Sequence, residues 1–314
     1  MRRLKILTWH LHGAYLYYLT QAPHDFYVLS KPGRPPGYAG RFGHIPWGAN
    51  VHDLPVERLH DQPLDLVLYQ DDPHWLVDRH ALLSEAQRRL PSIYLEHDPP
   101  LEHPTGQRHF VDSPEVLLVH VTPFNALMWD SGRCPTRTID HGVIVPEQAR
   151  YTGELARGIV AINHIDQRGR RLGGDVWRFA RDRVPLDLVG MANESAGGIG
   201  EVIHKDLPAF EARYRFFFNP IRWTSMGLAV IEAMMVGLPI VGLATTEMAT
   251  AIRNGESGFV DTDPAKLVDV MQALLRDPAE ARRLGEGARR HALERFGIGR
   301  FVADWNETFA HVCS

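Results

Sequence analysis

Short apolar runs that alternate with helical segments restrict the fold of this chain more than any other feature. Four candidate strands lie in each half, at residues 5–9, 64–69, 93–95 and 117–121, and at 158–162, 186–189, 215–219 and 240–243. Apolar residues at helical spacing lie between them, for example at 75–90 and 174–183. Strands that alternate with helices form parallel sheets covered by helices on both faces. The pattern therefore predicts an α/β protein with two doubly wound, Rossmann-like domains.

The length and the interruptions of the pattern place the domain boundaries. A chain of 314 residues is long for one hydrophobic core. The periodicity breaks at 146–153, so we expect an N-terminal domain at 1–150 and a C-terminal domain at 151–298. Residues 299–314 are amphipathic and predict a helix that packs back on the N-terminal domain. The stretch 30–50 is rich in glycine and proline and predicts a functional or mobile loop.

Composition and charge exclude several classes of protein. The net charge of −4 gives no support for a nucleic-acid binder, which normally carries a basic excess. Two cysteines without CxxC spacing exclude a cysteine zinc site and favour a reducing cytoplasm. The first residues, MRRLKILTWHLHG, are interpreted as a strand rather than a signal peptide. No apolar run reaches the ~20 residues of a membrane span, so we expect a soluble cytoplasmic protein that can still work at the inner membrane surface.

The segment TSMGLAVIEAMMVGLP (224–239) carries the clearest chemical signal. Gly227 precedes a run of helix-forming residues, and Gly237 and Pro239 end that helix. A small-residue loop that enters a helix presents free backbone N–H groups and the positive end of the helix dipole. This arrangement suits a diphosphate, although many helices begin with glycine for structural reasons alone.

The second half of the chain resembles the retaining glycosyltransferases of family 4. The matching sequence is NPIRWTSMGLAVIEAMMVGLPIV, followed by TTEMATAIRNGESGFVDTDPAKLVDVMQALLRDP and ARRHALERFG. The first half resembles the family only loosely, through WHLHG, YLEHDPP and VTPFNALMWDSG. The resemblance implies the GT-B fold, in which two Rossmann-like domains face an interdomain cleft. It implies that the N-terminal domain, 1–150, binds the acceptor and that the C-terminal domain, 151–298, binds the nucleotide-sugar donor. It also implies a nucleoside-diphosphate sugar as co-substrate, with no metal and no further cofactor.

The family motif is a glutamate, seven residues and a second glutamate, and this chain keeps only the second. Glu232 matches the second acid, which by resemblance binds the ribose of the donor. Thr224 stands where the family has its first glutamate, beside the donor sugar. Thr224 or Ser225 can still hydrogen-bond a sugar hydroxyl but supplies no charge. The amides of three following residues would face the phosphates, namely Gly227, Leu228 and Ala229.

Basic residues are expected at the leaving diphosphate, because negative charge grows there as the glycosidic bond breaks. Arg171 lies closest to the family's lysine, with Arg168 or Arg170 as its partner, and arginine binds phosphate bidentately. A solvated basic loop is the alternative reading.

Two positions of the N-terminal half also match the family. His97 resembles a histidine near the reacting sugar, and Gly13 follows the first strand where the domain approaches the ligands. Glu247 resembles the position of an acidic residue near the donor.

These resemblances imply a retaining hexosyltransferase of bacterial polysaccharide or glycolipid synthesis, with a saccharide or lipid-linked acceptor. The missing first acid keeps a second hypothesis open, a non-catalytic nucleotide-sugar-binding relative or partner subunit. A sugar epimerase of the same architecture is a third, and it does not explain the 219–241 match. Seventeen histidines raise the question of a metal, but no HxxxH pair has a plausible third ligand.

Overall fold

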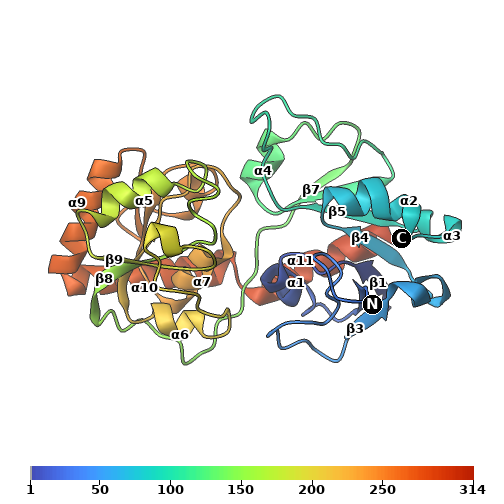
Figure 1. Cartoon of the computed structure of the whole chain (residues 1–314), viewed down its shortest axis with the longest axis horizontal. Coiled ribbons are helices and arrows are strands. Elements are labelled where there is room, and N and C mark those ends of the chain that lie inside the picture. Colours follow the sequence, from blue (N-terminus) through green and yellow to red (C-terminus); the bar gives the residue numbers. More distant parts are fainter. Residues whose placement is uncertain (1) are drawn as a thin grey trace. The chain divides into compact units, whose positions relative to one another are not determined.

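The computed structural model describes residues 2–314 and divides them into two compact units. Unit 1 comprises the chain up to Gly142 together with Ile298–Ser314, and unit 2 comprises Val143–Gly297. The change of unit therefore falls at residue 143, whereas the sequence pattern predicted it near residue 150. The two units are coloured along the sequence in Figure 1, where the red helix α11 (Ile298–Val312) lies among the blue and green elements of unit 1.

Unit 1 is built on a parallel sheet of seven strands in the order β3-β2-β1-β4-β5-β6-β7. The strands are β1 (Lys5–Thr8), β2 (Asp25–Ser30), β3 (Val51–Pro55), β4 (Leu66–Tyr69), β5 (Ser92–Glu96), β6 (Val116–His120) and β7 (Thr136–Thr138). The order reverses direction between β1 and β4, so the sheet is doubly wound. The parallel sheet predicted from the alternating pattern is confirmed.

Helices cover both faces of this sheet. On one face α1 (Gly13–Leu19) contacts α11, and the Phe309 ring of α11 meets the Phe26 ring of β2. The other face holds a core that includes Leu7, Val67 and Leu118. The remaining helices of unit 1 are short, namely η1 (Val56–Asp61), η2 (His74–Asp78), α2 (Arg79–Ala81), α3 (Glu85–Arg88) and α4 (Pro123–Met128).

The single helix predicted at 75–90 is wrong. The segment instead contains η2, α2 and α3, with a break after Leu82. Ser84 causes the break, because its hydroxyl accepts the backbone N–H of Gln87 while the Gln87 side chain accepts the Ser84 N–H. This capping box starts a new helix in the middle of the apolar periodicity.

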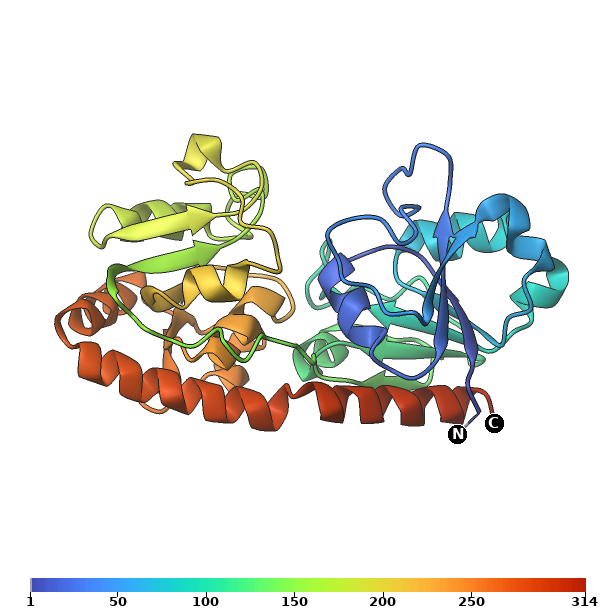
Figure 2. The same cartoon turned by 90° about the horizontal axis from the view of Figure 1, so that it is seen from below.

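Unit 2 is built on a parallel sheet of five strands in the order β12-β11-β10-β8-β9. The strands are β8 (Leu155–Ala161), β9 (Leu186–Val189), β10 (Tyr214–Asn219), β11 (Ile240–Leu243) and β12 (Gly258–Asp261). The helices are α5 (Gly174–Arg181), η3 (Glu194–Ala196), α6 (Leu207–Glu211), α7 (Leu228–Val236), α8 (Met248–Ala251), α9 (Pro264–Arg276) and α10 (Pro278–Arg295). The core on one face joins α5 and α9 to the strands, while α7 contacts α6, α10 and the strands β10 and β11. Figure 2 shows α10 as the long helix at the edge of unit 2.

Candidate functional site

The candidate site lies in unit 2 at the carboxyl ends of its parallel strands. The sheet reverses its winding direction between β8 and β10, so the loops after these strands lead away from a shared crevice. The loop after β8 runs to α5, and the loop after β10 runs to α7. Doubly wound sheets bind their ligands at such a switch point. Both loops carry the residues that the sequence singled out.

The start of α7 presents unoccupied backbone donors. Gly227 precedes the helix with extended backbone angles, and no side chain caps the first turn. The backbone N–H groups of Val230 and Ile231 donate to the Gly227 carbonyl. Leu228 and Ala229 precede these first hydrogen bonds of the helix. Their N–H groups lack partners within the helix, as the first residues of any helix do. The positive end of the helix dipole adds to this potential anion site.

Glu232 lies one turn further along α7 and is buried. Its side chain is only 2% exposed, and its Oε1 atom lies 2.9 Å from Nε2 of His204. This contact raises the pKa of His204, because a nearby carboxylate favours the protonated ring. His204 itself is 41% exposed and reaches Glu232 from the solvent side.

A cavity of about 240 Å³ opens at this position. Its lining includes Glu232, His204, Leu228 and Ala229, together with residues at the ends of β8 and β9. Complete small-molecule sites usually enclose about 300–1,000 Å³, so this cavity suits part of a ligand. Gly190, which follows β9, has a φ of +131°, and a Cβ atom there would lie 2.4 Å from the carbonyl oxygen of Ile162. Glycine therefore lets the two loops approach each other beside the cavity.

A second glutamate, Glu211, lies buried behind Glu232. It is fully buried in α6, and neither carboxyl oxygen has a hydrogen-bond partner within residues 2–314. Burial raises the pKa of Glu211 well above its ordinary value, and the nearby charge of Glu232 adds to the effect. Glu211 consequently keeps its proton in the folded protein under conditions where the unfolded chain has lost it.

This burial predicts that Glu211→Leu stabilises the protein. The unfolded chain releases the Glu211 proton above its ordinary pKa of 4.5, whereas the folded chain retains it, so wild-type stability falls as pH rises above that value. Removing the unpaired group should raise the free energy of unfolding at neutral pH by about 1–3 kcal/mol, and by less at pH 5. Urea unfolding at both pH values measures the difference. An identical pH slope for wild type and variant would contradict the account.

The basic loop after β8 is joined directly to the loop after β10. The backbone carbonyl of Arg171 accepts the N–H groups of Arg222 and Trp223 at 3.0 and 3.2 Å. Close packing makes this possible, because a Cβ atom at Gly173 would lie 1.9 Å from the carbonyl oxygen of Pro220. Arg171 and Thr224 are thus held on neighbouring stretches of backbone.

The three predicted arginines differ in their surroundings. Arg170 is exposed and forms an ion pair with Asp175 at 2.6 Å. Arg222 forms a second ion pair with the same carboxylate. These two arginines hold the pKa of Asp175 below its usual range. Arg168 and Arg171 form no side-chain hydrogen bond or ion pair within the part of the chain described here, residues 2–314. Arg168 is exposed and Arg171 is half-buried, so both guanidinium groups remain available to a ligand.

Thr224 and Ser225 lie half-buried in the loop that precedes α7. Neither carries charge, so this loop offers hydroxyl groups where a carboxylate was expected from the resemblance. Glu247, in contrast, is buried and its Oε1 atom accepts from Arg295 at 2.6 Å. This ion pair ties the start of α8 to the end of α10, so Glu247 has a structural role in this structure.

His97 and Gly13 belong to unit 1. His97 follows β5 and is buried, with its Nε2 atom 3.1 Å from the side-chain oxygen of Gln70. Burial lowers the pKa of His97 well below its ordinary value, and His12 and His141 add to the effect, so the ring is neutral. Gly13 is the first residue of α1 and lies close to His10. A Cβ atom at position 13 would lie 3.1 Å from Nε2 of the His10 ring.

Three features of the site were not predicted from the sequence, namely His204, Glu211 and the Asp175–Arg222 pair. His204 lies in an irregular stretch, 28 residues before Glu232, and no motif connects the two. Arg222 stood inside the matched segment, but only the folded loop shows that it shares Asp175 with Arg170. A buried acid without a partner, such as Glu211, has no signature in a helical pattern.

Residues 2–314 contain no group of three or more His, Cys, Asp or Glu side chains that is arranged to hold a metal ion. Within the same residues, no helix combines the length and apolar character needed to cross a membrane.

Part of the second unit is similar in sequence to a known family. Residues 186–277, which run from β9 to the end of α9 and include the whole of α7, match the sequence model of the family described as glycosyl transferases group 1. The matched range holds Glu232 and the α7 N-terminus, and the basic loop at 163–173 precedes it.

Relatives and solved structures extend the comparison. The chain is 35% identical over 130 residues to D-inositol 3-phosphate glycosyltransferase 1 of Catenulispora acidiphila, which covers 38% of this chain and 30% of that protein. It is 38% identical over 100 residues to D-inositol 3-phosphate glycosyltransferase of Frankia alni, and this match covers 29% of this chain and 25% of that protein. The chain therefore aligns with less than a third of the length of these relatives.

Solved structures resemble the fold of the whole chain. It matches sucrose-phosphate synthase of Thermosynechococcus elongatus with a TM-score of 0.70 and 16% identity over 99% of both chains. It matches Anabaena HepE, solved in complex with UDP, with a TM-score of 0.70 and 15% identity over 99% of this chain and 100% of that chain. These likenesses show the GT-B type of fold that the resemblance implied, two parallel α/β sheets in one chain.

Proposed function

We propose that the chain is a retaining glycosyltransferase that moves a hexose from a UDP-sugar to a hydroxyl group of an acceptor. The observation that carries this proposal is the cavity at the α7 N-terminus, where buried Glu232 faces the ends of β8 and β9. Support for uridine as the base comes from the structural neighbours, because Anabaena HepE was solved with UDP and with UDP-glucose.

In this proposal the nucleotide binds to unit 2 through three kinds of contact. Glu232 accepts hydrogen bonds from the ribose hydroxyls. The half-exposed His204 ring, which contacts this carboxylate in the structure, moves aside when the ribose binds. The diphosphate meets the backbone N–H groups of Leu228 and Ala229. Arg171 and Arg168 supply positive charge from the adjoining loop, since neither is engaged elsewhere within residues 2–314.

The chemical step follows from the charge on the leaving group. The bond between the sugar C1 atom and the phosphate oxygen breaks while C1 forms a bond to the acceptor oxygen. The acceptor proton passes to the departing phosphate oxygen on the same face, as the family resemblance implies. The positive groups around the diphosphate stabilise the charge that develops there. No side chain of this chain has to act as an obligatory base.

A second candidate function is a nucleotide-sugar-binding protein that does not transfer sugar. Thr224 favours it, because the loop beside the α7 N-terminus lacks the carboxylate expected at the donor sugar. We further propose a role in bacterial polysaccharide or glycolipid synthesis, on the family resemblance alone. The experiment that tests the leading proposal is transfer from UDP-hexoses, with the anomeric configuration of the product read by NMR.

A further inference from the structure

Unit 2 contains a second hollow, which lies away from the cavity at Glu232. This α10 hollow has a volume of about 200 Å³ and lies between α10 and the turn 253–257, which leads into β12. The strands β12 and β9 are the two edges of the sheet, and the turn precedes β12. The α10 hollow is therefore at the opposite edge and the opposite end of the sheet from the cavity at Glu232. Small-molecule sites usually enclose about 300–1,000 Å³, so this hollow suits a small ion.

Three buried residues form the floor of the α10 hollow. Gly287 lets α10 lie directly against the turn, because a Cβ atom at this position would lie 1.8 Å from the carbonyl oxygen of Glu256. Ser257 is 1% exposed, and its hydroxyl oxygen accepts the backbone N–H of Arg253 at 2.9 Å. The third floor residue is His291, which is 8% exposed. Packing of the helix against the turn thus fixes the shape of the floor.

His291 is a buried ring without a hydrogen-bond partner. Neither Nδ1 nor Nε2 forms a hydrogen bond within residues 2–314. Burial lowers the pKa of His291, and the charges of Arg253 and Arg295 lower it further. Glu294 and the nearby backbone carbonyl of Ala251 act in the opposite direction, and the ring is neutral at neutral pH. Buried polar side chains are rarely left without partners, so these nitrogens point to a bound polar group.

The rim of the α10 hollow is exposed and charged, and it comprises Arg253, Arg283, Arg290, Glu256 and Glu294. Arg283 is engaged, because it forms an ion pair with Glu280 at 2.6 Å. Arg253 lies 3.8 Å from Glu256, which is longer than a hydrogen bond. Arg290 forms no side-chain hydrogen bond or ion pair within residues 2–314. Two guanidinium groups at the rim are therefore available to an anion.

The two glutamates of the rim restrict which anion fits. A carboxylate only accepts hydrogen bonds, so it repels an anion that carries no proton. A phosphate ion keeps at least one P–OH group at neutral pH. That group can donate to Glu256, Glu294 or the acceptor nitrogen of His291, while the other oxygens accept from the arginines. Sulfate offers acceptors alone, so this mixture of groups favours phosphate.

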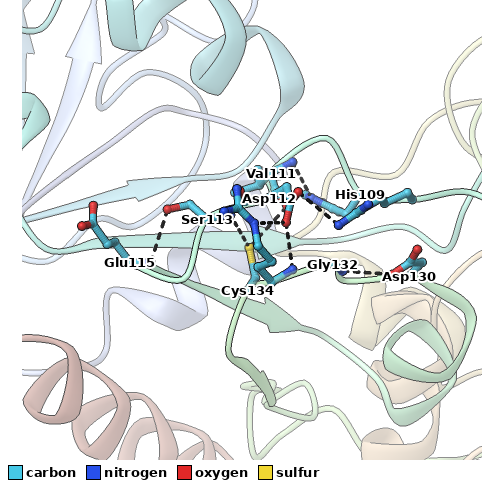
Figure 3. Close-up of polar contacts among 10 residues, drawn as sticks. His109, Val111, Asp112, Ser113, Glu115, Asp130, Gly132 and Cys134 are labelled. Carbon is cyan, nitrogen blue, oxygen red and sulfur yellow. Dashed lines mark hydrogen bonds and ion pairs between the residues drawn. The ribbon is translucent and has the colours of Figure 1, made fainter.

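A larger hollow in unit 1 lacks such a buried group. It has a volume of about 630 Å³ and lies at the amino ends of β5 and β6, where Ser113 and Glu115 line it. Figure 3 shows the Ser113 N–H donating to the Cys134 sulfur and the Glu115 N–H donating to the Ser113 hydroxyl. Within residues 2–314 its unpartnered buried nitrogen is Nε of Arg79, whose side chain is half-exposed. An arginine that reaches solvent does not indicate a ligand as the buried ring of His291 does.

We propose that the α10 hollow binds a phosphate ion, with Arg253 and Arg290 as its charge partners and His291 as its hydrogen-bond partner in the floor. The bound ion would satisfy both the buried ring and the unneutralised rim. This site is independent of the proposed transfer function, because none of its residues lines the cavity at Glu232.

The test is an NMR titration of the full chain with inorganic phosphate at pH 8 and constant ionic strength. The chain has 17 histidines, so the His291 ring signal is assigned by its loss in His291→Phe. This signal should shift to saturation with a Kd of about 1 mM or lower. Sulfate should bind about fivefold or more weakly, and so should methyl phosphate, whose dianion has no P–OH group.

Exposed arginines supply the variants, since their removal leaves the core intact. Arg253→Ala and Arg290→Ala should each weaken phosphate binding by about two- to fivefold, and the double variant should weaken it further. Arg276→Ala removes an exposed arginine of the same unit outside the hollow and should leave the affinity unchanged. Saturating UDP should not change it either.

A His291 signal that stays unshifted up to about 10 mM phosphate would overturn the proposal. Sulfate or methyl phosphate binding as tightly as phosphate would also overturn it, as would wild-type affinity in the double arginine variant. Displacement of phosphate by UDP would remove this second site and leave the proposed function standing. Phosphate binding at His291 in a chain that binds no UDP would remove the transferase function and leave the phosphate site.

Discussion

Glu232→Ala is expected to weaken UDP binding by about 10- to 150-fold. Hydrogen bonds to a charged group contribute about 1.5–3 kcal/mol, and the proposed ribose contacts depend on this carboxylate. Glu232 lines the unit 2 cavity and is the only acidic residue of α7, so no other acid of this helix can replace it. Titration calorimetry with UDP, and with uracil alone as the comparison ligand, measures the effect. Uracil affinity should hardly change, because the base does not need the ribose contacts.

Two variants separate lost binding from lost folding. Glu286→Ala removes an exposed glutamate of α10 and should leave UDP affinity at the wild-type value. His204→Ala keeps the carboxylate but removes its imidazole partner, so UDP affinity should be maintained or increased. If Glu232→Ala folds normally and binds UDP as wild type does, the ribose assignment is wrong.

Arg171→Ala is expected to lower the rate of sugar transfer by about 10²- to 10³-fold. Loss of one preorganised donor at a site of developing charge has effects of this size. The backbone carbonyl of Arg171 accepts hydrogen bonds from the N–H groups of Arg222 and Trp223. The backbone at this position is therefore expected to stay in place when the Arg171 side chain is removed. Single-turnover kinetics with UDP-glucose separate this effect from weaker donor binding. Arg171→Lys should recover part of the rate, since the charge remains but the bidentate fork is lost.

The remaining arginines supply the controls. Arg276→Ala removes an exposed arginine in the last turn of α9 and should not change the rate. Arg170→Ala should have a small effect on the rate, because Arg222 still holds Asp175. If Arg171→Ala transfers sugar at the wild-type rate while Arg168→Ala does not, the phosphate contact belongs to Arg168.

Much of the fold followed from local pattern. The eight predicted strands correspond to β1, β4, β5, β6, β8, β9, β10 and β11, because buried parallel strands are continuous apolar runs. The strands β2, β3, β7 and β12 were missed. β3 ends in proline, and β7 has the sequence TRT with two exposed residues, so neither carries a strong apolar signal. The break at Ser84 was missed because a capping box inside an apolar repeat looks like a continuous helix.

The candidate site was only partly predictable for a different reason. Gly227 and Glu232 lie close together in the chain, so helical geometry alone relates them. The position of Arg171 beside the Thr224 loop depends on the contact of Gly173 with Pro220, which is a packing event between distant segments. The contact of His204 with Glu232 and the burial of Glu211 are likewise tertiary.

The measurement that tests the central claim most directly is the transfer assay with UDP-hexoses and a saccharide acceptor, read by NMR. We predict UDP release coupled to a product that keeps the α configuration of the donor. A β-linked product would contradict retention. UDP binding without any product would contradict the enzyme and support the non-catalytic alternative. In that case Thr224→Glu, which restores the family acid, shows whether the missing carboxylate is the cause.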